Sequence, residues 1–326
     1  MTELALVTGA AGHIGGVLVR ELVAQGRSVR VLEHDDARAI DGLDVQRVRG
    51  DMRDPASLAE AVKGVDVVFH LAAIISILGE RGGLLTAINV QGVWNIARAA
   101  REAGVRRFVH FSSCHAFDLD QPHVDETTAR PKPSDPAYNR SKAAGEQALR
   151  DQIARGLDAV IVNPTGVIGP YDFKPSRMGR LALHVMRRRM PSLVEGGFDW
   201  VDVRDVVRTA LAAERAGRTG ENYLTGGAWR SLADVAQILA NVARVKPPAV
   251  VAPLWLARLG APFMDLYNAM TDLEPLYTTE SLHAVRATRD ISSAKARREL
   301  GHTARPLQET LRDVHQWFSD AGMLRR

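Results

Sequence analysis

A short apolar stretch followed by three regularly spaced glycines constrains the fold of this chain more than any other feature. Residues 4–7 are all apolar, and Gly9, Gly12 and Gly15 come after them. A continuous apolar run of this kind is typical of a buried strand in a parallel sheet. Apolar residues then recur at helical spacing, at Ile14, Val17, Leu18 and Leu22. This spacing predicts a helix that begins near Gly12.

The three glycines suit a turn that binds a phosphate group. Gly9 permits a tight turn, Gly12 lets the backbone approach a pyrophosphate, and Gly15 allows close packing of helix on strand. The N-terminus of the helix offers free N–H groups and a partial positive charge to that pyrophosphate. The usual dinucleotide fingerprint is Gly-x-Gly-x-x-Gly, whereas this chain has Gly-x-x-Gly-x-x-Gly. In an arbitrary loop, such glycines would equally indicate a structural turn.

An acidic residue at the end of the next apolar stretch favours the dinucleotide interpretation. Glu33 follows residues 28–32, roughly where the fingerprint places a carboxylate that binds the adenosine ribose hydroxyls. Strand, glycine turn, helix and carboxylate together predict dinucleotide binding. Because a carboxylate here repels the extra phosphate of NADP, we expect NAD as the favoured cofactor. Arg38 is the residue that argues for NADP instead.

The composition is that of an ordinary soluble globular protein. The 326 residues are 46% hydrophobic and 25% charged, and 42 Lys and Arg residues against 38 Asp and Glu give a net charge of +4. This small basic excess argues only weakly for nucleic acid or membrane, so we expect neither as a partner. The single cysteine, Cys114, excludes an intramolecular disulfide framework and a cysteine-based zinc site, and no metal site is expected. With no secretory leader pattern, a cytoplasmic location is expected.

Two further segments can be interpreted either as structural or as functional. Residues 250–270 are the most membrane-like, but Arg258, Asp265 and several prolines and glycines interrupt them, so no membrane span is expected. We predict a pair of helices that cover the substrate there instead. The arginines at 187–189 follow an expected helix that begins near Ser176. Since cations suit a helix C-terminus, a solvated helix end is favoured over an anion site.

Strand and helix patterns alternate over the first half of the chain. The expected strands are residues 5–8, 29–33, 45–48, 65–70, 107–112 and 159–163. The expected helices between them are residues 12–25, 55–63, 83–103 and 135–155. This alternation predicts an α/β fold of the Rossmann type, a doubly wound parallel sheet with right-handed crossovers.

The alternation stops after residue 165. The expected elements are then strands near 200–203 and 222–224 and helices at 232–243, 293–300 and 307–318. We therefore expect an NAD(P)-binding Rossmann domain over residues 1–168 and a smaller, mixed substrate-binding region over residues 169–326. The boundary is approximate, and some later strands or helices can return to the first domain.

A serine, a tyrosine and a lysine form a candidate catalytic group. Ser112 and Ser113 end the fifth expected strand, and Tyr138 and Lys142 lie four residues apart on one face of the next helix. A lysine ammonium beside a phenol lowers the phenol's pKa from its ordinary value of about 10. The phenol then serves as general acid for carbonyl reduction or as base for alcohol oxidation. A serine hydroxyl across the gap would bind the substrate oxygen. By itself, a Tyr-x-x-x-Lys pair is more often a surface pair.

With these features together, the sequence resembles the extended short-chain dehydrogenases/reductases, also called the NAD-dependent epimerase/dehydratase superfamily. The resemblance covers nearly the whole chain. It rests on short motifs at residues 8–15, 50–52, 70–73, 89–92, 112–113, 138–142, 163–170 and 291–301.

The resemblance implies a role for each matching residue. Ser113 would polarise the substrate oxygen, Tyr138 would be the acid/base, and Lys142 would set its pKa and anchor the cofactor ribose. Ser112 would be a cofactor contact or a strand-end hydrogen bond. With Tyr138 and Lys142, the implied cofactor contacts are Gly9, Ala11, Gly12, His13, Ile14, Glu33, Asp51, Met52, Leu71, Ala72, Ala73, Asn89, Asn163, Thr165 and Val167. His34 stands where family reductases that take NADP usually have an arginine, which also favours NAD.

One departure from the family pattern bears on the substrate. Phe198 occupies the position where nucleotide-sugar enzymes commonly place a phosphate-binding arginine. The chain is more similar to the dihydroflavonol reductase-like and hydroxysteroid dehydrogenase-like branch, whose substrates are apolar alcohols and carbonyls. Apolar residues at Trp255, Phe263 and Tyr267 would suit such a substrate, and core packing explains them equally well.

Three functions are therefore weighed. The leading one is an NAD(P)-dependent oxidoreductase that transfers hydride between the nicotinamide and a carbonyl or secondary alcohol of a small, apolar molecule. The second is a nucleotide-sugar epimerase or dehydratase with tightly held NAD, in which Arg177, Arg180 and residues 187–189 bind the phosphates. The third, a non-catalytic NAD(P)-binding regulator, predicts loss of the serine, tyrosine or lysine, and all three are present. The family also implies a homodimer, paired through the helices at 83–103 and 135–155.

Overall fold

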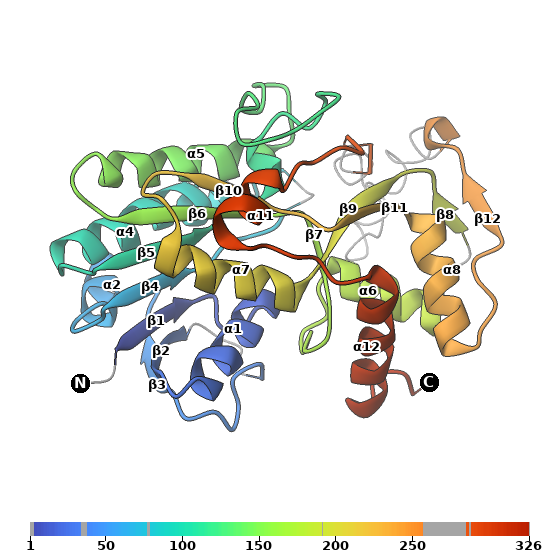
Figure 1. Ribbon diagram of the computed structural model, residues 1–326, viewed down its shortest axis with the longest axis horizontal. Helices are drawn as coiled ribbons and strands as arrows, with labels where there is room; N and C mark the ends of the chain where they lie inside the picture. The colour runs from blue at the N-terminus through green and yellow to red at the C-terminus, as the bar shows by residue number, and fades with distance from the viewer. Residues whose placement is uncertain are drawn as a thin grey trace.

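A seven-stranded parallel sheet forms the larger part of the protein (Figure 1). The computed structural model describes residues 3–33, 38–76, 79–190, 192–256, 285–286 and 288–325. The strands of the sheet are, in chain order, β1 (Leu4–Thr8), β2 (Ser28–Glu33), β3 (Gln46–Arg49), β4 (Val67–His70), β5 (Arg107–Phe111), β6 (Ala159–Pro164) and β10 (Asn222–Thr225). Their order is β10-β6-β5-β4-β1-β2-β3, and every neighbouring pair is parallel. The predicted doubly wound α/β fold is confirmed.

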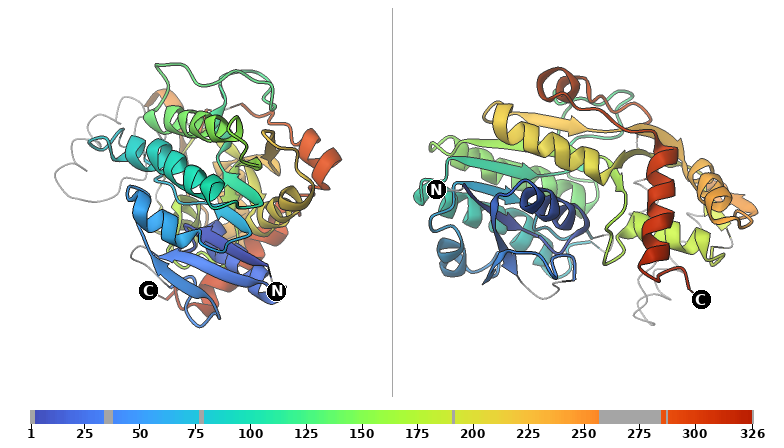
Figure 2. Two further views of the ribbon diagram at one scale, coloured as in Figure 1. Left: turned by 90° about the vertical axis from the view of Figure 1, so that its left-hand side faces the viewer. Right: turned by 60° about the horizontal axis from the view of Figure 1, so that its bottom comes forward.

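Helices cover both faces of this sheet, as the two views of Figure 2 show. One face carries α1 (His13–Ala24), α7 (Val203–Ala216) and α11 (Ala294–Leu300). The other carries α2 (Pro55–Ala61), α4 (Val93–Glu102) and α5 (Ala137–Ile153). Because both faces are covered, the strands read as apolar runs, and all six residues of β6 are buried.

The strand order places a topological switch between β1 and β4. From β1 the chain goes outward to β2 and β3, and from β4 it goes the other way to β5, β6 and β10. Ligands of open α/β sheets bind outside the carboxyl ends of the strands at such a point. The glycine turn after β1, the residues after β4 and the serines after β5 all lie at these ends.

A smaller mixed part adjoins this carboxyl edge (Figure 1). It has a three-stranded sheet of β7 (Gly166–Ile168), β9 (Gly197–Asp202) and β11 (Ala228–Ser231), and a two-stranded sheet of β8 (Ser192–Val194) and β12 (Val250–Ala252). Its helices are α6 (Arg177–Met186), α8 (Leu232–Ala243) and α12 (Leu307–Asp320), which pack around an apolar cluster of their own. Among the described residues, no helix is long and apolar enough to cross a membrane.

Several elements differ from the sequence-based expectations. The helix expected at 83–103 is interrupted by a π-helical turn, η1 (Ala87–Gly92), between the short α3 (Leu84–Thr86) and α4. The strand expected at 200–203 ends at Asp202, because the Asp202 carboxylate accepts the Arg204 N–H and caps α7. The expected strand near 222 is β10, which extends the main sheet beside β6.

The expected helix pair at residues 250–270 is wrong at its start. Residues 250–252 form the strand β12, paired in parallel with β8. Trp255 is exposed at 64% of its surface. Phe263 and Tyr267 lie outside the described residues, as does His34.

Candidate active site

The glycine turn packs directly against the chain that follows β4. Gly9 has a φ of +70°, in the left-handed region that favours glycine, and a Cβ there would lie 2.7 Å from the amide nitrogen of Ala72. A Cβ on Gly15 would lie 2.2 Å from the carbonyl oxygen of Gly9. The Thr8 hydroxyl joins the two segments, since its oxygen accepts the N–H groups of Leu71 and Ala72 at 3.2 Å each.

This turn fits the pyrophosphate of a dinucleotide. Helix α1 begins with Gly12 as its N-cap, without a capping hydrogen bond from that residue's side chain and without an acidic residue in its first turn. Its first N–H groups are therefore available to an anion. The predicted cofactor contacts Ala11, Gly12, His13 and Ile14 lie on this turn and the first turn of α1. Ala73, another predicted contact, is exposed just beyond Ala72.

The residues predicted to bind the adenosine end lie after β2 and β3. Glu33 is the last residue of β2, and its Oε1 lies 3.5 Å from Nη1 of Arg47. The Asp51 carboxylate accepts the Arg53 backbone N–H at 2.8 Å. Met52 is buried, and its backbone oxygen accepts the Asn95 amide at 3.0 Å. The Gly50 N–H donates to the Glu33 carbonyl at 3.2 Å, so the ends of β2 and β3 lie side by side, and the adenosine role of these residues stays a prediction.

Asn89 holds segments of the protein together. Its Nδ2 donates to the Ile74 carbonyl at 2.9 Å and to the Ser141 hydroxyl at 3.0 Å, and its Oδ1 accepts the Ile74 N–H at 2.8 Å. Both amide hydrogens are therefore engaged. A Cβ on Gly145 would lie 2.2 Å from the Asn89 carbonyl oxygen, so α5 packs tightly on the π-helical turn. Asn89 thus lies beneath the residues after β4, and its cofactor contact stays a prediction.

Ser113 and Tyr138 are brought together by the end of β5 and the start of α5. Ser113 caps the short 3₁₀ helix η2 (Cys114–Ala116), where its hydroxyl accepts the His115 N–H at 3.2 Å. Tyr138 is the second residue of α5 and lies close enough to Ser113 for that side chain to lower the pKa of the phenol. The His115 ring packs edge-on against the Tyr138 ring, with centroids 5.7 Å apart. This is the juxtaposition expected of an acid/base and its substrate-polarising partner.

The pKa of Tyr138 runs against the sequence-based expectation. Burial raises it to about 12, while the polar side chain of Ser113 and the positive charge of Arg177 lower it. The lowered pKa expected from the sequence is therefore wrong for the chain by itself, because the effect of burial outweighs the positive charge of Arg177. Arg177, the first residue of α6, was not expected to act on the phenol.

Lys142 is buried below Tyr138 on the same helix. It is 4% exposed, and its Nζ donates to the Phe111 carbonyl at 3.1 Å. Burial lowers its pKa to about 8, and the charge of Glu146 works in the other direction. Burial and the charge of Lys142 lower the pKa of His70 to about 3 and that of His110 well below its ordinary value. Two neutral histidines, stacked 5.2 Å apart, therefore lie close to this ammonium.

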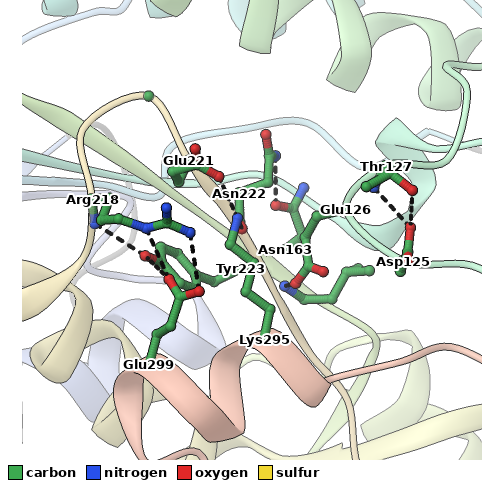
Figure 3. Close-up of polar contacts among 12 residues, drawn as sticks. Asp125, Glu126, Thr127, Asn163, Arg218, Glu221, Asn222, Tyr223, Lys295 and Glu299 are labelled. Atoms are coloured by element: carbon green, nitrogen blue, oxygen red, sulfur yellow. Dashed lines mark hydrogen bonds and ion pairs between the residues drawn. The ribbon is translucent and has the colours of Figure 1, made fainter.

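A buried network holds Ser113 against α5. The Asn163 Nδ2 donates to the Ser113 carbonyl at 3.0 Å and to Glu146 Oε1 at 2.7 Å. Asn222 on β10 donates to Asn163 Oδ1 at 2.8 Å (Figure 3). It also donates to Glu146 Oε2 at 2.9 Å. Lys295 on α11 fixes that part of β10, since its Nζ donates to the Asn222 carbonyl at 2.8 Å. The network uses the whole amide of Asn163, whose direct cofactor contact stays a prediction.

The remaining predicted residues face the smaller part of the protein. The Thr165 hydroxyl donates to Asp199 Oδ1 at 2.7 Å, and Val167 pairs with Val201 between β7 and β9. The side chain of Ser112 is buried, and its hydroxyl has no hydrogen-bond partner among the described residues. Its backbone N–H donates to the Val162 carbonyl at 2.8 Å and continues the pairing of β5 with β6, while the cofactor contact of its side chain stays a prediction.

Two features of the sequence bear on the class of substrate, namely Phe198 and the arginines that follow α6. In the structure, Phe198 packs against apolar residues and Arg187 closes a helix. The Phe198 ring meets the Trp200 ring edge to face at 5.5 Å and packs against the apolar cluster of the smaller part. Arg187 is the C-cap of α6, and its Nε donates to the Met323 carbonyl at 2.9 Å. Arg187 therefore closes the end of a helix, and this role is favoured over that of an anion site.

Comparison with known proteins agrees with this geometry. Residues 5–226 match the family described as "NAD dependent epimerase/dehydratase family". The chain belongs to this family. Within it, the chain lies in the dihydroflavonol reductase-like and hydroxysteroid dehydrogenase-like branch of the extended short-chain dehydrogenases/reductases. The family depends on nicotinamide cofactors.

Individual relatives cover the chain from end to end. "Sterol demethylase protein B" of Methylococcus capsulatus is 36% identical over 98% of this chain and 99% of its own length. A "putative dihydroflavonol 4-reductase" of Synechocystis is 32% identical over 100% of this chain and 97% of its own. The crystal structure of gox2253 is similar with a TM-score of 0.85 and 34% identity, over 99% of this chain and 100% of that one.

Proposed function

We propose that this family member is an oxidoreductase that transfers hydride between NAD and a carbonyl or secondary alcohol of a small, apolar substrate. The nicotinamide, when bound, supplies or accepts the hydride. Tyr138 would hold or release the proton at the substrate oxygen, and Ser113 would bind that oxygen. The observation that carries this proposal is the placement of Ser113 close to Tyr138, whose ring packs on that of His115, above a buried Lys142 at the carboxyl edge of the sheet.

The charge of Lys142 supports its role as an anchor. With a pKa of about 8, it is charged at neutral pH although it is almost fully buried. A buried ammonium is costly unless hydrogen bonds satisfy it, and the Phe111 carbonyl supplies one acceptor for its three N–H groups. Ribose hydroxyls would supply further acceptors. We therefore assign Lys142 to the cofactor ribose.

The apolar substrate class is supported by the Phe198 position and by the two relatives. Phe198 packs on Trp200 where a phosphate-binding arginine would be expected in nucleotide-sugar enzymes. The relatives are named for a sterol and a dihydroflavonol. Neither name contains a nucleotide sugar.

The experiment is a substrate screen with the purified protein and NADH. Apolar ring ketones and aliphatic ketones are offered in parallel with nucleotide sugars, and loss of NADH and formation of alcohol are measured. We expect NADH-dependent reduction of at least one apolar ketone. Conversion of a nucleotide sugar without net loss of NADH, and no ketone reduction, would contradict the proposal.

One observation favours a second candidate, a nucleotide-sugar epimerase or dehydratase. The positive charge of Arg177 acts on Tyr138, and such a charge would suit an anionic substrate. This candidate keeps its NAD through the catalytic cycle. The two candidate functions are separated by denaturing freshly purified protein and measuring the mass and amount of any nucleotide released. Near-stoichiometric NAD supports the second candidate, and little nucleotide supports the first.

A further inference from the structure

The His13 side chain connects the glycine turn to a distant segment of the chain. His13 begins α1, and its Nε2 lies 2.9 Å from the carbonyl oxygen of Pro170. A carbonyl only accepts, so Nε2 carries a proton and donates it. The other ring nitrogen, Nδ1, lies 4.0 Å from Oδ2 of Asp172. The imidazole is 7% exposed, so it is packed between the two segments and little solvent reaches it.

Asp172 forms the other end of this contact and belongs structurally to α6. It is 1% exposed, and its Oδ2 accepts the backbone N–H of Ser176 at 2.8 Å and the Ser176 hydroxyl at 2.7 Å. Ser176 is in turn the N-cap of α6, whose Gly179 N–H it accepts at 3.1 Å. A Cβ on Gly179 would lie 2.1 Å from Asp172 Oδ2, so the helix packs directly on the carboxylate.

Aromatic contacts hold the same segment between α1 and α12. The Arg20 guanidinium of α1 lies 4.5 Å from the centre of the Phe173 ring. Trp317 of α12 packs on Tyr171 and Phe173, with ring centres 5.0 Å and 4.7 Å apart. Tyr171 has a φ of +66°, which is strained for a residue with a side chain. Such strain is concentrated at ligand clamps and switch segments.

The N-terminus of helix α6 also carries a charge that acts on the proposed acid/base. Its first residue is Arg177, whose charge lowers the pKa of Tyr138 against the effect of burial. The N-terminus of α6 is thus tied to His13 through Asp172, and it carries Arg177, whose charge acts on Tyr138.

We propose that His13 and Asp172 are positioning residues that couple NAD binding at the glycine turn to the placement of the N-terminus of α6. The proposal rests on the proposed function, because it takes NAD as the ligand of that turn. Binding the pyrophosphate fixes the backbone at the start of α1, and with it the His13 ring and its two contacts. A ligand shifts a conformation only if it binds that conformation better, so NAD and the His13–Asp172 contact stabilise each other.

The test is hydrogen exchange of the full chain with and without saturating NAD, followed by mass spectrometry. Calorimetry measures NAD binding in parallel. In the wild type, NAD is expected to slow exchange both in residues 9–24 and in residues 170–186, by about fivefold or more in the second segment. Because the coupling is reciprocal, His13→Ala is expected to bind NAD more weakly than the wild type; at NAD concentrations that saturate it, residues 9–24 should be protected but residues 170–186 should not.

Two further variants make the result specific. Glu21→Ala changes an exposed residue of the same helix and is expected to behave as the wild type. Asp172→Asn keeps an oxygen for Ser176 but removes the charge that faces His13, so it is expected to behave as His13→Ala. It also provides the test if His13→Ala does not fold.

The outcomes separate this inference from the proposed function. If the wild type binds NAD and protects only residues 9–24, or if both variants transmit protection as the wild type does, the coupling is contradicted and the proposed function stands. If the wild type does not bind NAD, both proposals fail.

Discussion

The side-chain amide of Asn163 donates to the backbone carbonyl of Ser113 at 3.0 Å and is itself fully buried. The same nitrogen donates to Glu146 on α5 at 2.7 Å. One amide therefore ties the end of β5, which carries Ser113, to the helix that carries Tyr138 and Lys142. This bond therefore helps to fix the relative position of the two segments that carry the proposed catalytic side chains.

Asn163→Ala is expected to destabilise the protein. It leaves the Glu146 carboxylate, the Ser113 carbonyl and the Asn222 amide with fewer partners in a buried site, which costs about 3 kcal/mol in the free energy of unfolding. Urea denaturation measures the change. Asn241→Ala, at an exposed position on α8, is the control and is expected to change stability by less than about 0.5 kcal/mol. Equal stability of the two variants would contradict the role of the network.

Lys142→Met is expected to change how stability depends on pH. Burial lowers the pKa of Lys142 from 10.5 to about 8. Below pH 8 the lysine is charged in the folded protein, and the whole cost of burying that charge lowers the stability of the fold. Between pH 8 and pH 10.5, Lys142 is protonated in the unfolded chain but neutral in the folded protein. The folded state therefore becomes more stable as pH rises, and the cost of burying the charge disappears near pH 10.5. Relative to Lys142→Met, the wild type should therefore gain up to about 3 kcal/mol between neutral pH and that value.

Denaturation at a series of pH values measures this gain. Lys63→Met, which removes an exposed lysine, is the control and should show no comparable gain. A constant difference between wild type and Lys142→Met across the series would show that Lys142 is not held in a desolvated site.

Glu33→Ala is expected to weaken the preference for NAD over NADP. The carboxylate would bind the ribose hydroxyls and repel the additional phosphate, so its loss should lower the ratio of the two affinities about tenfold or more. Arg47→Ala removes the ion pair at 3.5 Å but keeps the carboxylate, and it should retain the preference. Calorimetry with both cofactors measures the ratio. Equal affinity of the native protein for NAD and NADP would contradict the assignment.

Two glycine variants separate folding from cofactor binding. Gly15→Ala brings a Cβ within 2.2 Å of the Gly9 carbonyl and should cost about 1–3 kcal/mol of stability. Gly12→Ala places its Cβ 3.3 Å from that oxygen, at a φ of −77°, and should cost less. Its methyl group should nevertheless weaken NAD binding about tenfold, because it blocks the approach of the pyrophosphate. Unchanged NAD affinity in Gly12→Ala would contradict the proposed turn.

The elements with strong local signals were predictable from the sequence. Helix α8 occupies the expected residues 232–243, because Ser231 and Asp234 form a capping box before an amphipathic stretch. The parallel strands were predictable from their apolar runs. Helix α7 was not expected, and the pairing of β10 with β6 could not be foreseen. This pairing joins segments far apart in the chain, such as Asn222 and Ile161, and local periodicity carries no information about it.

Only those parts of the candidate site that recur at regular spacing along one helix were predictable from the sequence. Tyr138, Lys142 and Glu146 lie four residues apart on α5, so Glu146 could have been found by extending that spacing. Its partners Asn163 and Asn222 come from two other strands, and only the fold brings them together. The direction of the Tyr138 pKa shift depends on burial, which the sequence does not encode locally.

The most direct test of the account is the turnover of Tyr138→Phe with the ketone that the wild type reduces fastest. The variant keeps the aromatic ring but lacks the hydroxyl that would donate the proton. We expect turnover to fall by about 10²–10⁴-fold, while the affinity for NADH, measured by calorimetry, stays near that of the wild type. Near-normal turnover would remove Tyr138 from the mechanism and contradict the account.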